Sequence, residues 1–145
     1  MNLAIVVSKF NEEVTSGLLR GARQYLNEKQ IHIPESDVYE APGAFEIPLI
    51  AQTLARSGRY DGVVCLGCVI KGDTAHFEFI TLGATVGVMQ AMLKAKVPIG
   101  FGILATYNDK QAIDRSLPNA HNKGREAAAA VYETIQVLER IRENE

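Results

Sequence analysis

Several features that would assign a chain of this length to a particular class are missing from this sequence. The net charge is only −2, and both signs are interspersed without a block of lysines and arginines, so we expect neither nucleic acid nor an anionic membrane as a partner. No apolar run approaches the roughly 20 residues that a membrane-spanning helix needs. The first apolar run, Leu3–Val7, is too short and lacks the basic flank of a secretory signal. We therefore expect a cytoplasmic protein.

Cysteine is scarce, and the two cysteines that are present do not indicate redox or metal chemistry. Cys65 and Cys68 lie within the apolar run Val63–Ile70, which is typical of a buried strand. A redox pair with this spacing usually opens a helix, where the helix dipole lowers the thiol pKa. A structural zinc ion would need two further ligands, and no group of histidines or carboxylates has a suitable spacing. We expect inert thiols, no metal and no cofactor.

The composition is that of a globular domain. Of 145 residues, 47% are hydrophobic and 22% are charged, which supplies enough apolar side chains for a packed core. Short β-rich runs alternate with helical periodicity, which predicts parallel strands joined by right-handed crossovers. We predict one domain over residues 1–145, a three-layer α/β/α sandwich around a central, mainly parallel four-stranded sheet. The expected strands are Leu3–Val7, Asp37–Ala41, Val63–Ile70 and Pro98–Leu104, and the expected helices begin near Asn11 (as N-cap), Glu46, Phe77, Asp109 and Lys123.

The expected helix Phe77–Lys96 has almost no polar face. A helix that is apolar nearly all round is buried on more than one side, which a small domain cannot achieve alone. The helix is either the central core helix of a monomer or part of a subunit interface. We favour the interface and expect a homo-oligomer. Gly83 and Gly87, four residues apart, would allow another backbone to approach closely.

Ligands of open parallel sheets bind beyond the carboxyl ends of the strands, and the unusual residues of this chain follow the expected strands. Phe10 and Phe45 fall on two of these loops, where they either stack on a flat ring or pack the loops. The sequence of residues Gly67–Thr74 nearly matches the P-loop motif. However, Asp73 stands where the phosphate-binding lysine belongs, which disfavours nucleotide hydrolysis.

A simpler phosphate site remains possible near the same loop. The main-chain N–H groups of Gly72–Thr74 precede a helix and could hold a monophosphate. Arg115 is either a second, bidentate phosphate ligand or a solvated arginine at a helix end. His32 and His121 are expected on the surface. His76 stands in the first turn of the long helix, where the dipole disfavours a positive charge, and it is a candidate for accepting and passing a proton.

Six short motifs occur in order along essentially the whole chain. Individually each motif is modest, but jointly they are specific, and they resemble the lumazine synthase family of riboflavin biosynthesis. The motifs are Phe10-Asn11, Pro42-Gly43-Ala44-Phe45-Glu46-Ile47-Pro48, Gly72-Asp73-Thr74-Ala75-His76-Phe77, Phe101-Gly102-Ile103-Leu104, Gln111-Ala112-Ile113-Asp114-Arg115 and Asn122-Lys123-Gly124. The resemblance implies a flavodoxin-like sandwich.

The resemblance also implies an activity. The substrates would be 5-amino-6-(D-ribitylamino)uracil and 3,4-dihydroxy-2-butanone 4-phosphate, and the product 6,7-dimethyl-8-ribityllumazine, with phosphate and water released. His76 would move protons, and Phe10 would stack on the pyrimidine ring. Ala44, Phe45 and Glu46 would contact the ribityl chain, and Cys68, Val69 and Ile70 the uracil. Asp73 and Thr74 would bind the phosphate. The chain would assemble as a homopentamer or a higher assembly, in which the neighbouring subunit supplies three further substrate-binding residues, Phe101, Arg115 and Lys123.

The chain departs from the family pattern in two places. Ala105 stands where a threonine is common, and residues 117–121 replace a more glycine-rich loop. Two other functions remain open, a non-catalytic flavodoxin-like module that binds a flavin or another phosphate-bearing ligand, and a purely structural shell protein. The pairing of His76 with Arg115 favours catalysis. A phosphorelay receiver is disfavoured, because the first strand ends without the paired acidic residues that its metal needs.

Overall fold

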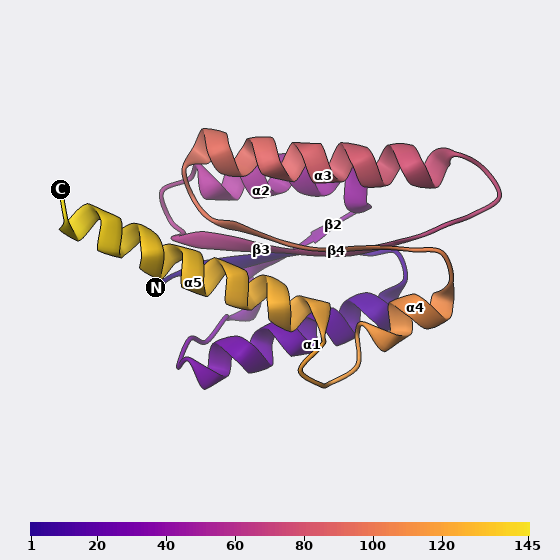
Figure 1. The fold of residues 1–145 in the computed structure, drawn as a ribbon, viewed down its shortest axis with the longest axis horizontal. Helices are drawn as coiled ribbons and strands as arrows, with labels where there is room; N and C mark the ends of the chain where they lie inside the picture. The colour runs from indigo at the N-terminus through magenta and orange to yellow at the C-terminus, as the bar shows by residue number, and fades with distance from the viewer.

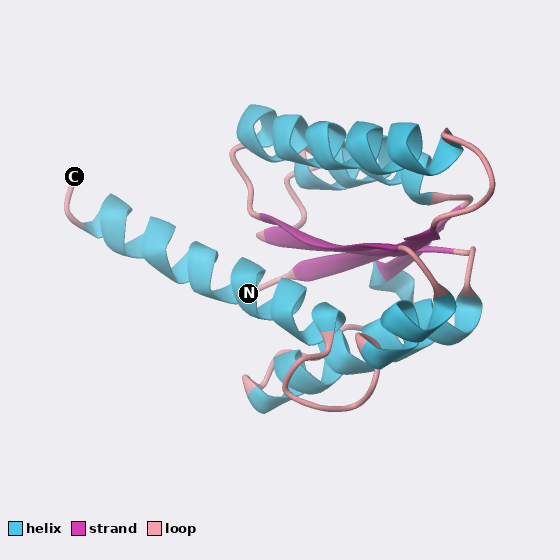
Figure 2. Cartoon of the chain, turned by 45° about the vertical axis from the view of Figure 1, so that its right-hand side comes forward, coloured by secondary structure: helices cyan, strands magenta, loops and turns pink.

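The computed structural model describes residues 1–145 as three layers, with a parallel sheet between two layers of helices (Figures 1 and 2). The strand order β2-β1-β3-β4 is that of the first four strands of the flavodoxin-like fold. This confirms the predicted α/β sandwich and its parallel, four-stranded sheet. The strands are β1 (Leu3–Ser8), β2 (Val38–Ala41), β3 (Gly62–Ile70) and β4 (Ile99–Thr106).

Helices cover both faces of the sheet, as Figure 1 shows. One layer contains α2 (Ile47–Ala55) and α3 (His76–Ala95), and the other contains α1 (Glu12–Glu28), α4 (Asp109–Asp114) and α5 (Lys123–Glu143). Short 3₁₀ turns, Glu35–Asp37 and Ala44–Glu46, precede β2 and α2. The carboxyl end of α5 extends past the sheet (Figure 2).

The two faces of the sheet contribute to two separate hydrophobic cores. Side chains alternate along a strand, so Leu3 and Ile5 of β1 pack towards α1 and α5, whereas Ala4 and Val6 pack towards α2 and α3. Ile5 pairs with Val38 on one side and with Val64 on the other. Because β1 and β3 are buried on both faces, their sequences are apolar without interruption.

All four strands differ from the predicted bounds by one or two residues, and two of these differences have a clear structural cause. The second strand begins at Val38 and not at Asp37, because Glu35–Asp37 forms a 3₁₀ turn. The last strand continues two residues past Leu104, because the ladder with β3 extends to the pair Ile70 and Thr106. Both differences concern the carboxyl or amino end of an element whose existence and type were predicted correctly.

Helix α3 carries two apolar faces, of which only one is buried in the chain. Ala84, Val88 and Ala91 pack against the sheet, whereas a second stripe at alternating spacings of three and four residues is exposed. Phe79 is 69% and Leu93 is 66% exposed, so α3 is not the central core helix of a monomer. The exposed stripe consists of Phe79, Leu82, Val86, Met89 and Leu93. None of the helices is both long enough and apolar enough to cross a lipid bilayer.

The two glycines of α3 allow the close approach that their spacing predicts, and the neighbour is a segment of the same chain. A Cβ atom on Gly83 would lie 2.7 Å from the ring of Phe45, and one on Gly87 would lie 2.8 Å from the ring of Pro48. Both glycines therefore make room for the 3₁₀ turn Ala44–Glu46 and the start of α2. The sequence does not show towards which neighbour a helix face turns, so this neighbour could not be predicted.

Candidate active site

A cavity opens at the carboxyl edge of the sheet, where the loops after β1, β2 and β3 meet the first turns of α3. Its volume is about 420 Å³, which is within the range of small-molecule sites. The walls are mostly apolar, with a few polar groups among them. The lining residues are Phe10, Asn11, Gly43, Ala44, Phe45, Glu46, Cys68, Val69, Ile70, His76 and Ile80.

The loop after β2 brings an aromatic ring and a carboxylate against one glycine. A Cβ atom on Gly43 would lie 3.1 Å from Glu46 Oε1 and 3.4 Å from Phe10 Cε2. A side chain at residue 43 would therefore crowd the Glu46 carboxylate and contact the Phe10 ring. Phe10 remains 67% exposed, so its ring is available to a flat ligand in the cavity.

Asn11 begins α1 in an unusual way. We expected its side chain to cap the helix, but it makes no cap hydrogen bond, and the main chain is left-handed with φ 60°. The amide Nδ2 instead donates to the main-chain oxygen of Cys68, at 3.0 Å. The main-chain oxygen of Asn11 accepts from the N–H groups of Val14 and Thr15, and this interaction starts the helix.

The end of β3 forms the floor of the cavity. Cys68 is 3% exposed and its side chain belongs to the core beneath α1 and α5, whereas Cys65 is fully buried in the opposite core. Burial raises the pKa of the Cys65 thiol to about 12. Burial, aided by Asp109, raises the pKa of Cys68 to about 11. These shifts agree with the predicted inert thiols, and they leave the main chain of Cys68 and its neighbours as the polar part of the floor.

The loop from Gly72 to Ala75 lies beside the cavity, and all four of its residues are exposed. The N–H group of His76, the first residue of α3, donates to Thr74 Oγ1 at 3.4 Å. On the outer side of the loop, the Phe77 ring lies 6.2 Å from that of Tyr107. Asp73 and Thr74 are thus adjacent in sequence to His76 without lining the cavity, and the main-chain N–H groups of an exposed helix start remain open to an anion.

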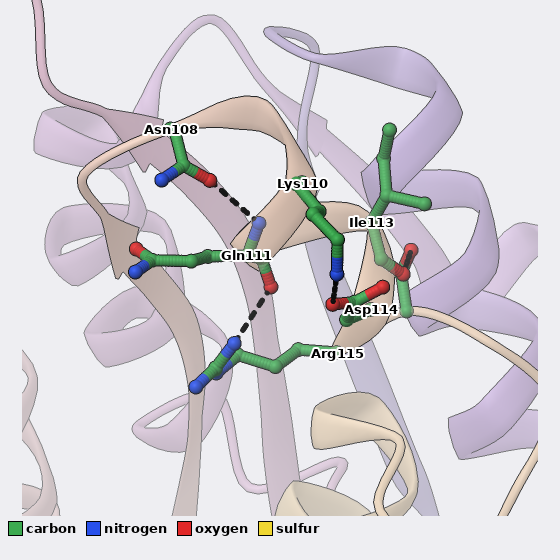
Figure 3. Close-up of polar contacts among 7 residues, drawn as sticks. Asn108, Lys110, Gln111, Ile113, Asp114 and Arg115 are labelled. Atoms are coloured by element: carbon green, nitrogen blue, oxygen red, sulfur yellow. Dashed lines mark hydrogen bonds and ion pairs between the residues drawn. The ribbon is translucent and has the colours of Figure 1, made fainter.

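Arg115 and Lys123 lie together, away from this cavity. The N–H group of Lys123 donates to the main-chain oxygen of Arg115 at 2.9 Å, so the two residues are neighbours where α4 ends and α5 begins. Lys123 Nζ lies 2.7 Å from Glu126 Oε2. Figure 3 shows the Arg115 guanidinium folded back along α4, where Nη1 donates to the main-chain oxygen of Gln111 at 2.9 Å. In Figure 1 α4 and α3 cover opposite faces of the sheet.

Comparison with known proteins agrees with this geometry. The sequence matches the family model of 6,7-dimethyl-8-ribityllumazine synthase over residues 1–139. The chain belongs to this family. It is 61% identical over 142 residues to 6,7-dimethyl-8-ribityllumazine synthase 1 of Caulobacter vibrioides, covering 98% of this chain and 93% of that protein. It is 46% identical to the synthase of Nitratidesulfovibrio vulgaris (97% and 90% covered) and 46% identical to that of Salinibacter ruber (95% and 88% covered).

The residues predicted from the resemblance to the lumazine synthase family divide into three groups. Eight of them line the cavity: Phe10, Ala44, Phe45, Glu46, Cys68, Val69, Ile70 and His76. Asp73 and Thr74 lie in the loop beside it. Phe101, Arg115 and Lys123 lie outside it, on β4 and at the adjoining ends of α4 and α5.

Three cavity residues were not among the predicted site residues of this lumazine synthase family member. Asn11 and Gly43 stand within the motifs that carried the resemblance, but no role was assigned to them. Ile80 lies one turn after His76 on α3, and helical spacing alone could have placed it on the same face. Asn11 bonds the main chain of Cys68 and Gly43 leaves room for Glu46, and such roles leave no residue-type signature in the sequence.

Proposed function

We propose that this chain catalyses the condensation for which its family is named. The 5-amino group of 5-amino-6-(D-ribitylamino)uracil attacks the carbonyl carbon of 3,4-dihydroxy-2-butanone 4-phosphate, and 6,7-dimethyl-8-ribityllumazine forms with loss of phosphate and water. The proposal rests on one observation above the others. The aromatic, carboxylate, main-chain and imidazole groups that such a pair of substrates requires converge from three loops on a single cavity.

In this proposal the cavity mainly orients the reactants. Phe10 stacks on the pyrimidine, and Glu46 accepts hydrogen bonds from the ribityl hydroxyls. The main chain around Val69 contacts the edge of the uracil ring. Orientation of this kind contributes about 7–11 kcal/mol in favourable systems. Imine formation, phosphate elimination and ring closure each require a proton to move, and His76 at the cavity wall is placed to carry it.

The phosphate is held by groups from two chains. The exposed main-chain N–H groups at Asp73 and Thr74 bind it from one side, and Arg115 with Lys123 of the neighbouring subunit binds it from the other. The position of Arg115 and Lys123 supports this arrangement, because their main chains are hydrogen-bonded to each other and both residues lie outside the cavity of their own chain. A bidentate arginine also stabilises the phosphate as it leaves.

Self-association into a homopentamer or a larger shell would bring these groups together. The exposed stripe of α3 is the surface that such a ring buries, since soluble monomers rarely expose a continuous apolar patch of this kind. Phe101 is 47% exposed and lies on the same face of the sheet as α3, because Ile99 and Ile103, two residues away on either side, pack in the α2/α3 core. A repeated contact between unlike surfaces closes into a ring.

In the same proposal residues 1–145 act as one domain in the cytoplasm. A non-catalytic module that binds a flavin or another phosphate-bearing ligand would use the same cavity. The imidazole of His76 at the cavity wall favours turnover, and so does the family, since the three relatives reported above are named as synthases. A purely structural shell protein would need no such cavity.

Turnover is tested by incubating the purified protein with both substrates and following the absorbance of the lumazine product. We expect product formation that requires both substrates. A protein that binds the lumazine but forms none from the two substrates would support the binding module and overturn the proposed catalysis.

Sharing of the site is tested by mixing variants after dissociation and reassembly. His76→Ala and Arg115→Ala damage different halves of each shared site. In a random equal mixture, about a quarter of the sites combine an intact His76 of one chain with an intact Arg115 of the next. The mixture should therefore be more active than the two variants assayed separately. Phe10→Ala mixed with His76→Ala is the matched control, because both residues line the cavity of one chain and no intact site can form. Equal behaviour of the two mixtures would contradict sharing.

The assembly itself is tested by size-exclusion chromatography with light scattering. The wild type should elute as a pentamer or larger. Val86→Glu, in the middle of the exposed stripe, should shift it to smaller species, whereas Gln24→Glu on the exposed face of α1 should not. A wild-type monomer at micromolar concentration would overturn the oligomer and with it the shared site.

A further inference from the structure

Three residues other than glycine have a positive φ in this chain, and one of them is in the cavity. Gln30 and Lys96 follow the carboxyl ends of α1 and α3, where a left-handed residue commonly ends a helix. Asn11, with φ 60°, stands at the beginning of a helix and lines the cavity. A left-handed residue at this position needs a different explanation.

The Asn11 side chain extends the sheet where its main-chain ladder ends. Pairing of β1 with β3 stops at Val7 and Leu66, so the main-chain oxygen of Cys68 lies beyond the last residue of β1 that could donate to it. Asn11 Nδ2 supplies that donor at 3.0 Å. The bond joins the loop after β1 to the floor of the cavity across 57 positions of sequence.

The same residue determines where the Phe10 ring lies. The left-handed turn at Asn11 reverses the chain between β1 and α1, and Phe10, immediately before it, projects over Gly43, 3.4 Å from the position of a Cβ atom there. The Phe10 ring and the Cys68 main chain line the same cavity, and Asn11 connects them, because it follows Phe10 in sequence and its side chain bonds Cys68. We call the space between the ring and the β3 end the slot.

We infer that Asn11 is a positioning residue that sets the width of the slot for the pyrimidine ring. The inference rests on the proposed function, in which Phe10 stacks on the pyrimidine and the β3 end reads its edge. Asn11 acts through these two neighbours, and its loss should weaken binding of the pyrimidine substrate while leaving the phosphate substrate unaffected.

Three variants separate the backbone from the side chain. Asn11→Gly accepts the left-handed conformation freely and loses only the amide. Asn11→Asp keeps the size and tolerates positive φ, but it places an acceptor against the Cys68 oxygen. Asn11→Ala loses both the amide and the preference for this conformation. Gln30→Gly is the matched control, because it relieves a positive φ outside the cavity.

We expect the KM for the pyrimidine substrate to rise roughly 3- to 10-fold in Asn11→Gly, the range for one neutral hydrogen bond, and more in Asn11→Asp. The KM for the phosphate substrate should stay within about twofold of wild type, since no group of that subsite touches Asn11. Binding of 6,7-dimethyl-8-ribityllumazine, followed by its own fluorescence, should weaken in parallel. Gln30→Gly should match the wild type in both KM values.

The possible outcomes decide between the claims. Unchanged pyrimidine KM in both Asn11→Gly and Asn11→Asp, with an active wild type, overturns the inference and leaves the proposed function standing. Equal changes in both KM values, accompanied by a lower Tm, also overturn it, because they indicate a general structural role. A wild type that binds the lumazine but does not form it overturns the proposed function. In that case the fluorescence titration still decides whether Asn11 shapes the slot.

Discussion

Arg115 Nη1 donates to the main-chain oxygen of Gln111, one helical turn earlier in α4, at 2.9 Å (Figure 3). Gln111 is itself fixed, because its N–H group donates to Asn108 Oδ1 at 2.9 Å and its Oε1 accepts from the N–H group of Tyr107 at 2.9 Å. One nitrogen of the guanidinium is therefore hydrogen-bonded to a residue of α4 that is itself held in place. Its remaining N–H groups are available to a phosphate.

Arg115→Ala should lower kcat/KM by at least about 10³, because both ground-state binding and stabilisation of the leaving phosphate are lost. The KM for the phosphate substrate should rise much more than that for the pyrimidine. Arg115→Lys keeps the charge but cannot bond Gln111 and a phosphate in the same fixed geometry, so it should recover only part of the loss. Steady-state kinetics with each substrate varied in turn measure this. An unaffected Arg115→Ala enzyme would contradict the role.

His76→Ala should be less damaging than Arg115→Ala. Removal of a positioned acid–base group typically lowers kcat by about 10²–10⁴, and we expect the lower end of that range, because the amine and water can exchange protons in an open cavity. Both KM values should change little. The measurement is kcat under saturation with both substrates, compared directly with Arg115→Ala. A complete loss of activity would show that the imidazole does more than move protons.

Gly43→Ala tests the packing of Phe10 and Glu46 without straining the backbone. Gly43 has φ −155°, which any residue can adopt, but the added methyl group would lie 3.1 Å from Glu46 Oε1 and 3.4 Å from the Phe10 ring. Both groups must shift by a few tenths of an ångström. We expect the KM for the pyrimidine substrate to rise about tenfold with little change in Tm. Gly58→Ala is a poor control, because Gly58 has φ +79°. Gly72→Ala has open space around it, and it controls only the KM for the pyrimidine substrate, because Gly72 belongs to the loop proposed to bind the phosphate.

The sequence predicted the parts of this site that depend on local pattern. Apolar runs located β1 and β3, and the loops that follow parallel strands necessarily meet at one edge, so Phe10, Phe45 and His76 could be brought together before the structure was known. The bond from Asn11 to Cys68 could not be predicted, because it depends on where the β1–β3 ladder ends. The direction of Gly83 and Gly87 depends on which element packs on α3, and periodicity does not specify that element.

Asn122→Ala should destabilise the fold. Asn122 is 1% exposed; its Nδ2 donates to the main-chain oxygens of Gly17 and Leu117 at 3.1 and 3.0 Å, and its Oδ1 accepts from the N–H group of Arg125 at 3.0 Å. The alanine removes two hydrogen bonds to main-chain oxygens from a buried position and also removes the cap of α5, which together lower the free energy of unfolding by about 2–4 kcal/mol.

Urea unfolding at one fixed protein concentration measures this loss, since assembly also contributes to stability. Asn119→Ala is the control, because its Oδ1 accepts from the exposed N–H group of His121 and its loss should change stability by no more than about 0.5 kcal/mol. Equal effects of the two substitutions on the free energy of unfolding would contradict a stabilising role for the buried Asn122 amide.

The buried thiols make stability depend on pH in the alkaline range. The Cys65 thiol ionises near its ordinary value of 9.0 in the unfolded chain, but burial raises its pKa to about 12 in the folded protein. Below pH 9 both states keep the proton, and the thiol contributes no pH dependence. Between pH 9 and 12 the unfolded chain releases a proton that the folded chain retains, so the free energy of unfolding falls as the pH rises, by up to about 1.4 kcal/mol per pH unit.

Cys65→Ala should remove this part of the decline. Urea titrations of the wild type and the variant at pH 8, 9, 10 and 10.5 give the slope for each. The variant is expected to start lower, because the smaller side chain leaves a void in the core, yet to lose less stability per pH unit. All other ionisable groups are common to both proteins, so the difference between the slopes isolates the thiol. Parallel slopes would mean that Cys65 is ionised, or accessible to water, in the folded protein.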